Sequence, residues 1–190
     1  MADQQEAIDR PADNLARTAA NVGGWVGRWQ WKGDFRYRNE TISQQFTARD
    51  RNRDRIRVHA GFLARVDETM RVEVLATTTE NGDAHSSNLT LSDANSRKSL
   101  DLNTAYFEWG PNAVWRLTRG KMRYPWVRTS SLFYDNDINP EGVAVNWQQG
   151  RTGLFAAAFV NRLAERAAAA DSSLFGAQVG WRAQFGDGGR

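Results

Sequence analysis

The chain of 190 residues contains no cysteine, which excludes a disulfide framework and thiolate metal sites. It also lacks long apolar runs, and its mean hydropathy is −0.65. No window approaches the roughly 18 consecutive apolar residues of a membrane-spanning helix, so helical spans are excluded. A transmembrane β-barrel is still allowed, because only every second residue of its strands contacts lipid.

The usual signatures of catalysis are missing as well. No GxSxG, HExxH, Walker or GxGxxG motif occurs, and neither His59 nor His85 stands beside a nucleophile or a carboxylate motif. We therefore expect no enzyme, no catalytic residue, no metal and no cofactor. The net charge of +3 is small, and the run RDRNRDRIR at 49–57 is half acidic or neutral and lacks interleaved aromatic residues, so we also expect no nucleic-acid partner.

One segment has the oxygen spacing of a calcium loop. Residues 135–141 read DNDINPE, but Pro140 occupies the position where an EF-hand requires glycine. We therefore predict a turn at the end of a long loop.

The most informative stretch is Trp29–Arg38, which reads WQWKGDFRYR. Aromatic residues and Gly33 occupy one set of alternate positions, and charged or amide residues occupy the other. A period of two predicts a β-strand with one apolar face and one strongly charged face.

The same alternation predicts seven further strands, at 55–66, 70–77, 100–109, 114–122, 142–147, 153–163 and 174–185. Two of them contain a conflict of phase. In the strand at 100–109, Leu100 and Leu102 fall out of step with Phe107 and Trp109, which a β-bulge or a strand leaving the apolar zone would explain. In the strand at 114–122, Arg119 and Lys121 share a face with Trp115 and Leu117, unless Gly120 marks a bulge or the strand has left that zone.

The connections between these strands alternate long and short along the whole chain. In an antiparallel meander, this places all short turns at one end of the sheet and all long loops at the other. That layout, with strands of roughly 10 residues, is typical of outer-membrane barrels. The fold class we predict is an all-β, antiparallel, up-and-down transmembrane β-barrel of about eight strands.

Two domains are expected: a polar tail at 1–24, helical or disordered, and a barrel domain at 25–190. The first ten residues, MADQQEAIDR, have no apolar core of a secretory signal. The barrel layout predicts a bacterial outer-membrane location, although the sequence given shows no signal peptide.

In a membrane barrel the charged faces must point inward, because an arginine facing lipid costs roughly 2 to 4 kcal/mol at the midplane. The inward charges either pair with one another or form a basic wall that favours anions. The long segment 123–139 is the best candidate for a loop that folds inward and narrows the pore. The pore-lining residues we predict are Lys32, Asp34, Arg36, Arg38, Arg55, Arg57, His59, Glu73, Glu108, Arg116, Gln178 and Arg182.

Several segments, taken in order, resemble the bacterial putative-porin family of outer-membrane β-barrels. They are WKGDFRYRNE, DRNRDRIRVHAGFLARVDE, LDLNTAYFEW, RGKMRYPW, DNDINPEG and SSLFGAQVGWRAQFGDG. The resemblance covers about residues 25–187. It implies a passive channel for small hydrophilic solutes, surrounded by outer-membrane lipid and lipopolysaccharide and often a homotrimer.

The barrels of that family have around sixteen strands, whereas about eight are predicted here. We therefore expect an N-terminal fragment of such a porin, with eight strands that close on their own as the alternative. An alternative from another class is a soluble, lipocalin-like barrel that binds a small ligand. That alternative requires the apolar faces inside and the arginine faces in water.

Overall fold

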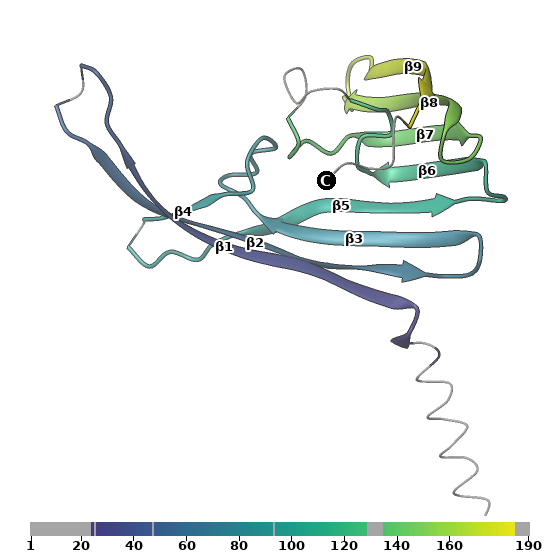
Figure 1. The fold of residues 1–190 in the computed structure, drawn as a ribbon. Coiled ribbons are helices and arrows are strands. Elements are labelled where there is room, and N and C mark those ends of the chain that lie inside the picture. The colour runs from purple at the N-terminus through teal and green to yellow at the C-terminus, as the bar shows by residue number, and fades with distance from the viewer. Residues whose placement is uncertain (1–23, 25, 47, 93, 129–134, 185–190) are drawn as a thin grey trace, which may run out of the picture.

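The computed structural model describes residues 24, 26–46, 48–92, 94–128 and 135–184. The predicted N-terminal tail lies almost entirely outside these residues. Nine strands form one antiparallel sheet (Figure 1), and their bounds are β1 Trp29–Ile42, β2 Arg51–Arg65, β3 Met70–Thr78, β4 Leu89–Leu91, β5 Leu100–Trp109, β6 Trp115–Lys121, β7 Glu141–Gln148, β8 Gly153–Ala164 and β9 Ser172–Arg182.

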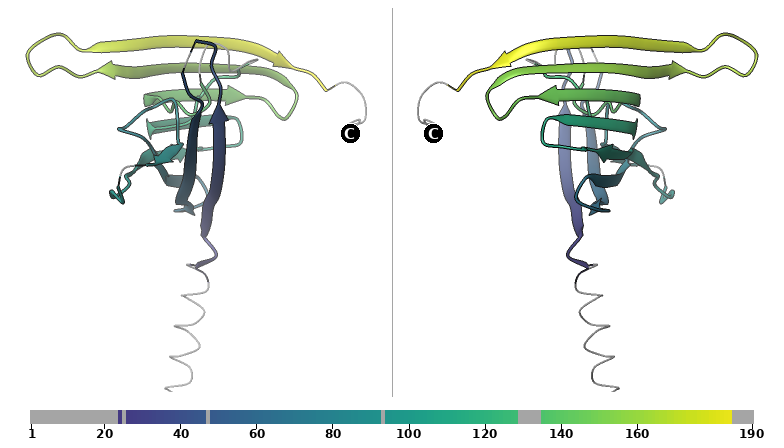
Figure 2. Two further views of the ribbon diagram at one scale, coloured as in Figure 1. Left: turned by 90° about the vertical axis from the view of Figure 1, so that its left-hand side faces the viewer. Right: turned by 90° about the vertical axis from the view of Figure 1, so that its right-hand side faces the viewer.

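Strand order follows the chain, β1-β2-β3-β5-β6-β7-β8-β9, and the short β4 pairs with β2 beside this path. The all-β, antiparallel, up-and-down prediction is therefore confirmed. β8 and β9 run across the direction of β1 and β2 (Figure 2), so the sheet is strongly twisted. β1 and β9 are not paired with each other, and the sheet is a partial barrel. Closure of these strands on themselves is not observed.

The two faces of the sheet differ as the alternation predicts. Large apolar side chains are exposed on the outer face, including Trp31 at 76%, Phe175 at 73% and Val179 at 72%. Most charged residues of the strands lie on the inner face, where the segment between β6 and β7 also packs. The lipocalin-like alternative is wrong for this structure, because it requires the apolar residues inside.

The predicted strands have the right order but not always the right length. β1 and β2 extend four residues further, through the pairs Asn39↔Asp54 to Ile42↔Arg51. The strand predictions leave that stretch out, because its charges alternate in sign, which is typical of a solvated loop. β4 was also missed, since it has only three residues, which pair with Asp54–Ile56 of β2.

The phase conflict in β5 is resolved by an irregularity. Leu75 pairs with Thr104 and Ala76 pairs with Leu102, so Asn103 is an extra residue in β5. This bulge brings Leu102 onto the outer face with Ala76. The prediction of a bulge there is confirmed.

The conflict in β6 has no such resolution. Pairing runs without a shift through Gly120 to both neighbouring strands, so Arg119 and Lys121 do share the outer face with Leu117. Gly120 has a φ of 128°, and a Cβ there would lie 2.2 Å from the carbonyl oxygen of Ala105. A glycine is therefore required at this close approach of β6 to β5.

The connections divide between the two ends of the sheet. The short turns 66–69, 110–114 and 149–152 lie at one end, called here the short-turn end, and the longer connections lie at the other, the long-loop end (Figure 1). This sidedness was predicted from the sequence. Within the described ranges, no helix has the length and apolar character needed to cross a membrane.

Candidate functional site

The structure places every predicted site residue on the inner face of the sheet. The register carries this face across neighbouring strands, for example from Arg71 through Glu108 and Thr118 to Ala144. That this face lines a pore stays a prediction. The residues concerned are Lys32, Asp34, Arg36, Arg38, Arg55, Arg57, His59, Glu73, Glu108, Arg116, Gln178 and Arg182.

Glu73 is the most buried charged residue of this face, at 1% exposure. Its carboxylate accepts from Lys32 Nζ at 2.6 Å, from Thr104 Oγ1 at 3.1 Å and from Arg123 Nη2 at 3.2 Å. Two cations from elements far apart in the sequence therefore share one carboxylate.

The same arrangement recurs along the inner face. Glu108 binds Arg71 and Arg116, both at 2.7 Å. At the long-loop end, Glu40 binds Arg53 at 2.5 Å and also Arg38. Each of these carboxylates thus has two guanidinium partners.

Asp34 holds a third type of pair. It accepts from Arg57 Nη2 at 2.8 Å and contacts Nδ1 of His59 at 2.6 Å. By contrast, Arg36 bonds to the amide oxygen of Asn88, and Arg182 bonds to that of Gln148 at 3.1 Å. Pairing between inner charges is therefore extensive, yet basic groups outnumber the carboxylates that they share.

Burial sharpens this imbalance. The side chain of Arg123 is 59% exposed while that of its partner Glu73 is 2% exposed. The side chain of Arg116 is 55% exposed while that of Glu108 is 12% exposed. At Glu73 and Glu108 the negative charge is thus recessed and the positive charge faces the solvent, whereas Asp34, with a side chain 44% exposed, is more open than its partner Arg57 at 26%.

The segment that follows β6 folds back over the inner face. Besides the Arg123–Glu73 pair with β3, the carbonyl oxygen of Pro125 accepts from Asn146 of β7 at 2.5 Å. Gln178 of β9 bonds to both backbone groups of Val127, at 2.8 and 3.0 Å. Residues 123–127 therefore contact β3, β7 and β9 at once, and the sheet curves around them (Figure 1).

Aromatic contacts complete this attachment. The ring of Trp126 stacks on Phe159 of β8, with centroids 4.2 Å apart. Phe159 in turn covers Gly176 of β9, where an added Cβ would lie 2.1 Å from the ring. Because Gly176 has no side chain, the inner surface at this position is flat, and the rings of Phe159 and Trp126 are layered over it.

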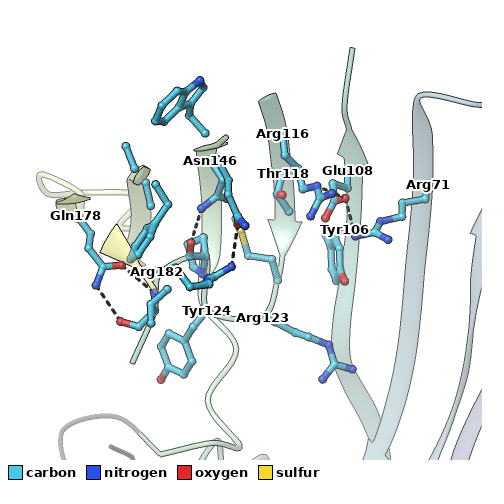
Figure 3. A pocket seen from close by; sticks show the side chains of 18 residues that line it. Arg71, Tyr106, Glu108, Arg116, Thr118, Arg123, Tyr124, Asn146, Gln178 and Arg182 are labelled. Carbon is cyan, nitrogen blue, oxygen red and sulfur yellow. Dashed lines mark hydrogen bonds and ion pairs between the residues drawn. The ribbon is translucent and has the colours of Figure 1, made fainter. Parts of the chain in front are cut away.

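A cavity of about 330 Å³ remains between the segment and the sheet. Figure 3 shows Gln178 and Arg182 on one side of it and Glu108 and Arg71 on the other. Arg116 and Arg123 also line it. The cavity is bordered by more basic than acidic groups.

The far part of the same segment returns along the inner face. Asn139 donates to the bulged Asn103 at 2.6 Å, and Asp137 accepts from the backbone of Ser87. The backbone amide of Asp137 donates to the side chain of Asp135, two residues earlier. This contact is typical of a turn and not of a metal site. The predicted turn is confirmed, and no cluster able to hold a metal ion occurs in the described part of the chain. The prediction of an inward loop at 123–139 is confirmed for 123–128 and 135–139, and 129–134 lie outside the described residues.

Several inner residues were missed from the sequence. Arg71 alternates correctly with Val72 and could have been included with Glu73. Arg53 lies in the charged stretch that the strand predictions leave out. Arg123 and Trp126 belong to no strand, so periodicity carries no signal for where they point.

The outer face carries a belt of tryptophans at the short-turn end. Trp29, Trp109, Trp115, Trp147 and Trp181 lie at or next to the strand ends that meet the short turns, and Trp31 lies two residues further along β1. Aromatic girdles of this kind flank the apolar band of membrane barrels.

A family model described as "Putative porin" matches residues 40–189, most of the chain. The chain belongs to the putative porin family. This membership confirms the resemblance found in the sequence, and it favours a channel over an enzyme. A search of curated proteins found no match to this porin-family chain.

Proposed function

We propose that this chain forms the wall and constriction of an outer-membrane channel for small hydrophilic solutes, with a preference for anions. The observation that carries the proposal is the inner face itself. Each buried carboxylate there is shared by two basic side chains, and the basic partner is the one exposed to solvent.

A pore wall of this kind has a positive potential at the surface that a solute meets. Low-dielectric surroundings strengthen that potential and raise the local concentration of anions. The inward segment brings Arg123 toward the centre of the curved sheet, so the narrowest passage has a basic border. This arrangement supports a selectivity that a fully paired wall would lack.

The outer face supports the membrane location. Its exposed apolar side chains suit outer-membrane lipid and lipopolysaccharide, and the tryptophan belt suits the interface at the short-turn end. Backbone groups at the edges of β1 and β9 must be paired in a membrane, because hydrocarbon offers them no hydrogen bonds. Insertion therefore requires both edges to be paired with further strands.

The test is ion selectivity in planar bilayers with the protein extracted from outer membranes. In a salt gradient, the reversal potential is expected to favour anions. Arg116→Gln and Arg123→Gln should each reduce that preference, because each removes an exposed charge from the cavity border. The control is Arg162→Gln, whose parent side chain pairs with Asp171 of the β8–β9 connection.

A reversal potential that favours cations in the unaltered protein would overturn the proposal. Unchanged selectivity in both inner variants would do the same. Recovery of the protein from the cytosolic rather than the outer-membrane fraction would contradict the location.

A further inference from the structure

Two pairs of arginines lie directly opposite each other on the inner face of the β1–β2 hairpin. The register pairs Arg36 with Arg57 and Arg38 with Arg55, so four guanidinium groups start from adjacent positions. We call these four residues the arginine quartet. Like charges directly opposite each other destabilise an antiparallel pair of strands. Two such pairs in succession therefore oppose folding and call for a role other than stability.

The quartet occupies a small area of the inner face. Opposite Cβ atoms of paired strands are about 5 Å apart, and alternate residues of one strand are about 7 Å apart. The four side chains therefore start from a rectangle that is no larger than a small anion with its contacts, and they are long enough to converge on one.

Two members of the quartet are held by neutral groups. Arg36 donates to the side-chain oxygen of Asn88, and Arg55 donates to the backbone carbonyl oxygen of the same residue at 2.9 Å. Asn88 is itself held by Ser86 in the connection between β3 and β4. A neutral oxygen fixes the direction of a guanidinium group without cancelling its charge. Both side chains are thus positioned and keep their full positive charge.

The carboxylates near the quartet leave it with an excess of positive charge. Asp34 and Glu40 each bind one member of the quartet, but each also binds a further basic residue, His59 or Arg53. Two other carboxylates act on Arg55 from the connection after β3, with side chains 51% and 47% exposed, namely Glu80 and Asp83. Water and salt screen such exposed charges. Basic groups therefore outnumber acidic ones here.

Burial leaves donors of the quartet without acceptors. The Nε atoms of Arg36, Arg38 and Arg55 are buried, and none has a hydrogen-bond partner among the residues that the structure describes. The side chain of Arg55 is only 12% exposed, so bulk water does not solvate it freely. A buried donor without a partner is costly. An oxyanion seated among the four side chains would supply acceptors and reduce their mutual repulsion.

The quartet lies toward the long-loop end of the sheet, where the β1–β2 hairpin extends beyond β3 (Figure 1). Arg36 and Arg38 follow Trp29 of the tryptophan belt by seven and nine residues. In a barrel with strands tilted by about 40°, these separations correspond to about 18 and 23 Å along the axis of an apolar band about 25 Å tall. The quartet is therefore at the entrance on the long-loop side, ahead of Arg123.

We propose that the arginine quartet binds the phosphate group of a small solute at this entrance. The proposal rests on the channel function proposed above and names a class of anion that it takes. Guanidinium groups match phosphate oxygens in bidentate pairs. A carboxylate has one charge and two oxygens, whereas a phosphate group near pH 8 has about two charges and three or four oxygens. The phosphate group is thus the better match for four arginines.

The test is calorimetric titration of the protein extracted from outer membranes, in detergent at low salt and pH 8, with inorganic phosphate or acetate as the probe. Phosphate should bind at least tenfold more tightly than acetate. Arg36→Gln and Arg55→Gln should each weaken phosphate binding at least fivefold, and each leaves only the neutral Asn88 behind. Arg36→Lys should cause a smaller loss, because it keeps the charge and removes the bidentate geometry.

The matched control is Arg65→Gln, which removes the same charge from the same strand and face at the short-turn end. Arg65 lies opposite Arg71, whose charge is paired with Glu108. Phosphate affinity should stay within twofold of the parent. Urea unfolding checks that the variants are folded. Phosphate should raise the urea midpoint of the parent and not that of Arg36→Gln, which without phosphate should resist urea at least as well as the parent.

Equal affinities for phosphate and acetate would overturn the proposal, because they would reflect a general attraction of anions. Equal losses in Arg36→Gln and Arg65→Gln would do the same. Loss of co-purified lipopolysaccharide from the quartet variants, with no phosphate binding by the parent, would assign the quartet to a lipid headgroup instead of a solute. Reversal potentials measured on the same samples separate the two proposals, since anion selectivity without phosphate binding contradicts this one alone.

Discussion

The two flanks of the sheet share an outer face and differ on the inner one. On β1–β3, the charged flank, inner positions carry Lys32, Asp34, Arg57 and Glu73. On β8 and β9, the aromatic flank, they carry phenylalanines, alanine, glycines and Gln178. Both flanks present tryptophan and other apolar residues outward.

The difference shows that the inner face performs two tasks. The charged flank exposes charged side chains to water and fixes their positions through shared carboxylates. The aromatic flank presents flat and small side chains, on which Trp126 stacks and to which Val127 is hydrogen-bonded. The inward segment connects the two, with Arg123 attached to one flank and Trp126 to the other.

The largest expected effect comes from breaking the attachment to the charged flank. Glu73→Gln should lower the free energy of unfolding by about 2 kcal/mol, because three charge-assisted or neutral hydrogen bonds lose a carboxylate acceptor. The loss stays below the 3–5 kcal/mol of a fully buried pair, since Lys32 and Arg123 retain access to water. Urea unfolding in detergent measures it.

Glu80→Gln is the matched control for that experiment. Its side chain is 51% exposed and lies 3.9 Å from Arg55, and the hydrogen bond it accepts from Thr90 Oγ1 at 3.0 Å can be kept by the amide oxygen of glutamine, so unfolding should be unchanged within a few tenths of a kcal/mol. Equal effects in both variants would contradict the special position of Glu73.

A smaller effect is expected from the aromatic flank. Trp126→Ala removes the stack on Phe159, which contributes about 1 kcal/mol beyond burial. The segment should then move away from β8 and the single-channel conductance should rise. Phe35→Ala, an exposed position on the outer face of β1, should leave the conductance as it is. An unchanged conductance for Trp126→Ala would show that the segment is held by Arg123 and by the hydrogen bonds of Pro125 and Val127 without the aromatic stack.

Selectivity should also distinguish the flanks. Arg57→Gln leaves Asp34 with His59 as its remaining ionisable partner, whereas Arg182→Gln leaves an uncharged Gln148. The first variant therefore removes a positive charge and uncovers a negative one. We expect about a twofold fall in the permeability ratio of anions to cations for Arg57→Gln and a smaller fall for Arg182→Gln, because one charge changes a focused potential by about kT. Reversal potentials measure both, and a larger change for Arg182→Gln would reverse the assignment of the flanks.

The smallest effect concerns the turn that joins β2 to β3 on the charged flank. The backbone amide of Thr69, with its hydroxyl and the amide of Met70, lowers the pKa of the Asp67 carboxyl. A lowered pKa in the folded state means that the stabilisation is present above the pKa of the unfolded chain. It is lost as pH falls through the folded pKa.

Asp67→Asn should accordingly lower the stability modestly at neutral pH, where the carboxylate is ionised, and flatten the dependence of unfolding on pH, so that the two forms converge in the acidic range. Urea midpoints measured from neutral to acidic pH give the slope for both forms. The same slope in both would mean that the turn is formed without this carboxylate.

How much of this could be predicted follows from which signal each residue carries. Alternation located the strands and assigned Arg36, Arg57 and Glu73 to one face, because a period of two fixes sidedness without knowledge of neighbours. It did not identify which cations share Glu73, since Lys32 and Arg123 meet there only through the register of β1–β3 and the course of the inward segment.

The missed elements have similar causes. The extension of β1 and β2 is polar or charged on both faces, so it carries no hydrophobic period. β4 has three residues, too few for a period, and it is fixed by its pairing with Asp54–Ile56 of β2. Arg119 was correctly placed by its phase, but the sequence suggested a bulge that the pairing does not contain.

The tryptophan belt has a consequence for observing this protein as it folds. Six of the eight indoles share nearly one level on the outer face, so most of the tryptophan emission reports a single plane. In vesicles with lipids brominated near the headgroups, quenching should arise when that plane reaches one leaflet. The chain thereby carries its own spectroscopic marker for the arrival of the short-turn end at the membrane boundary.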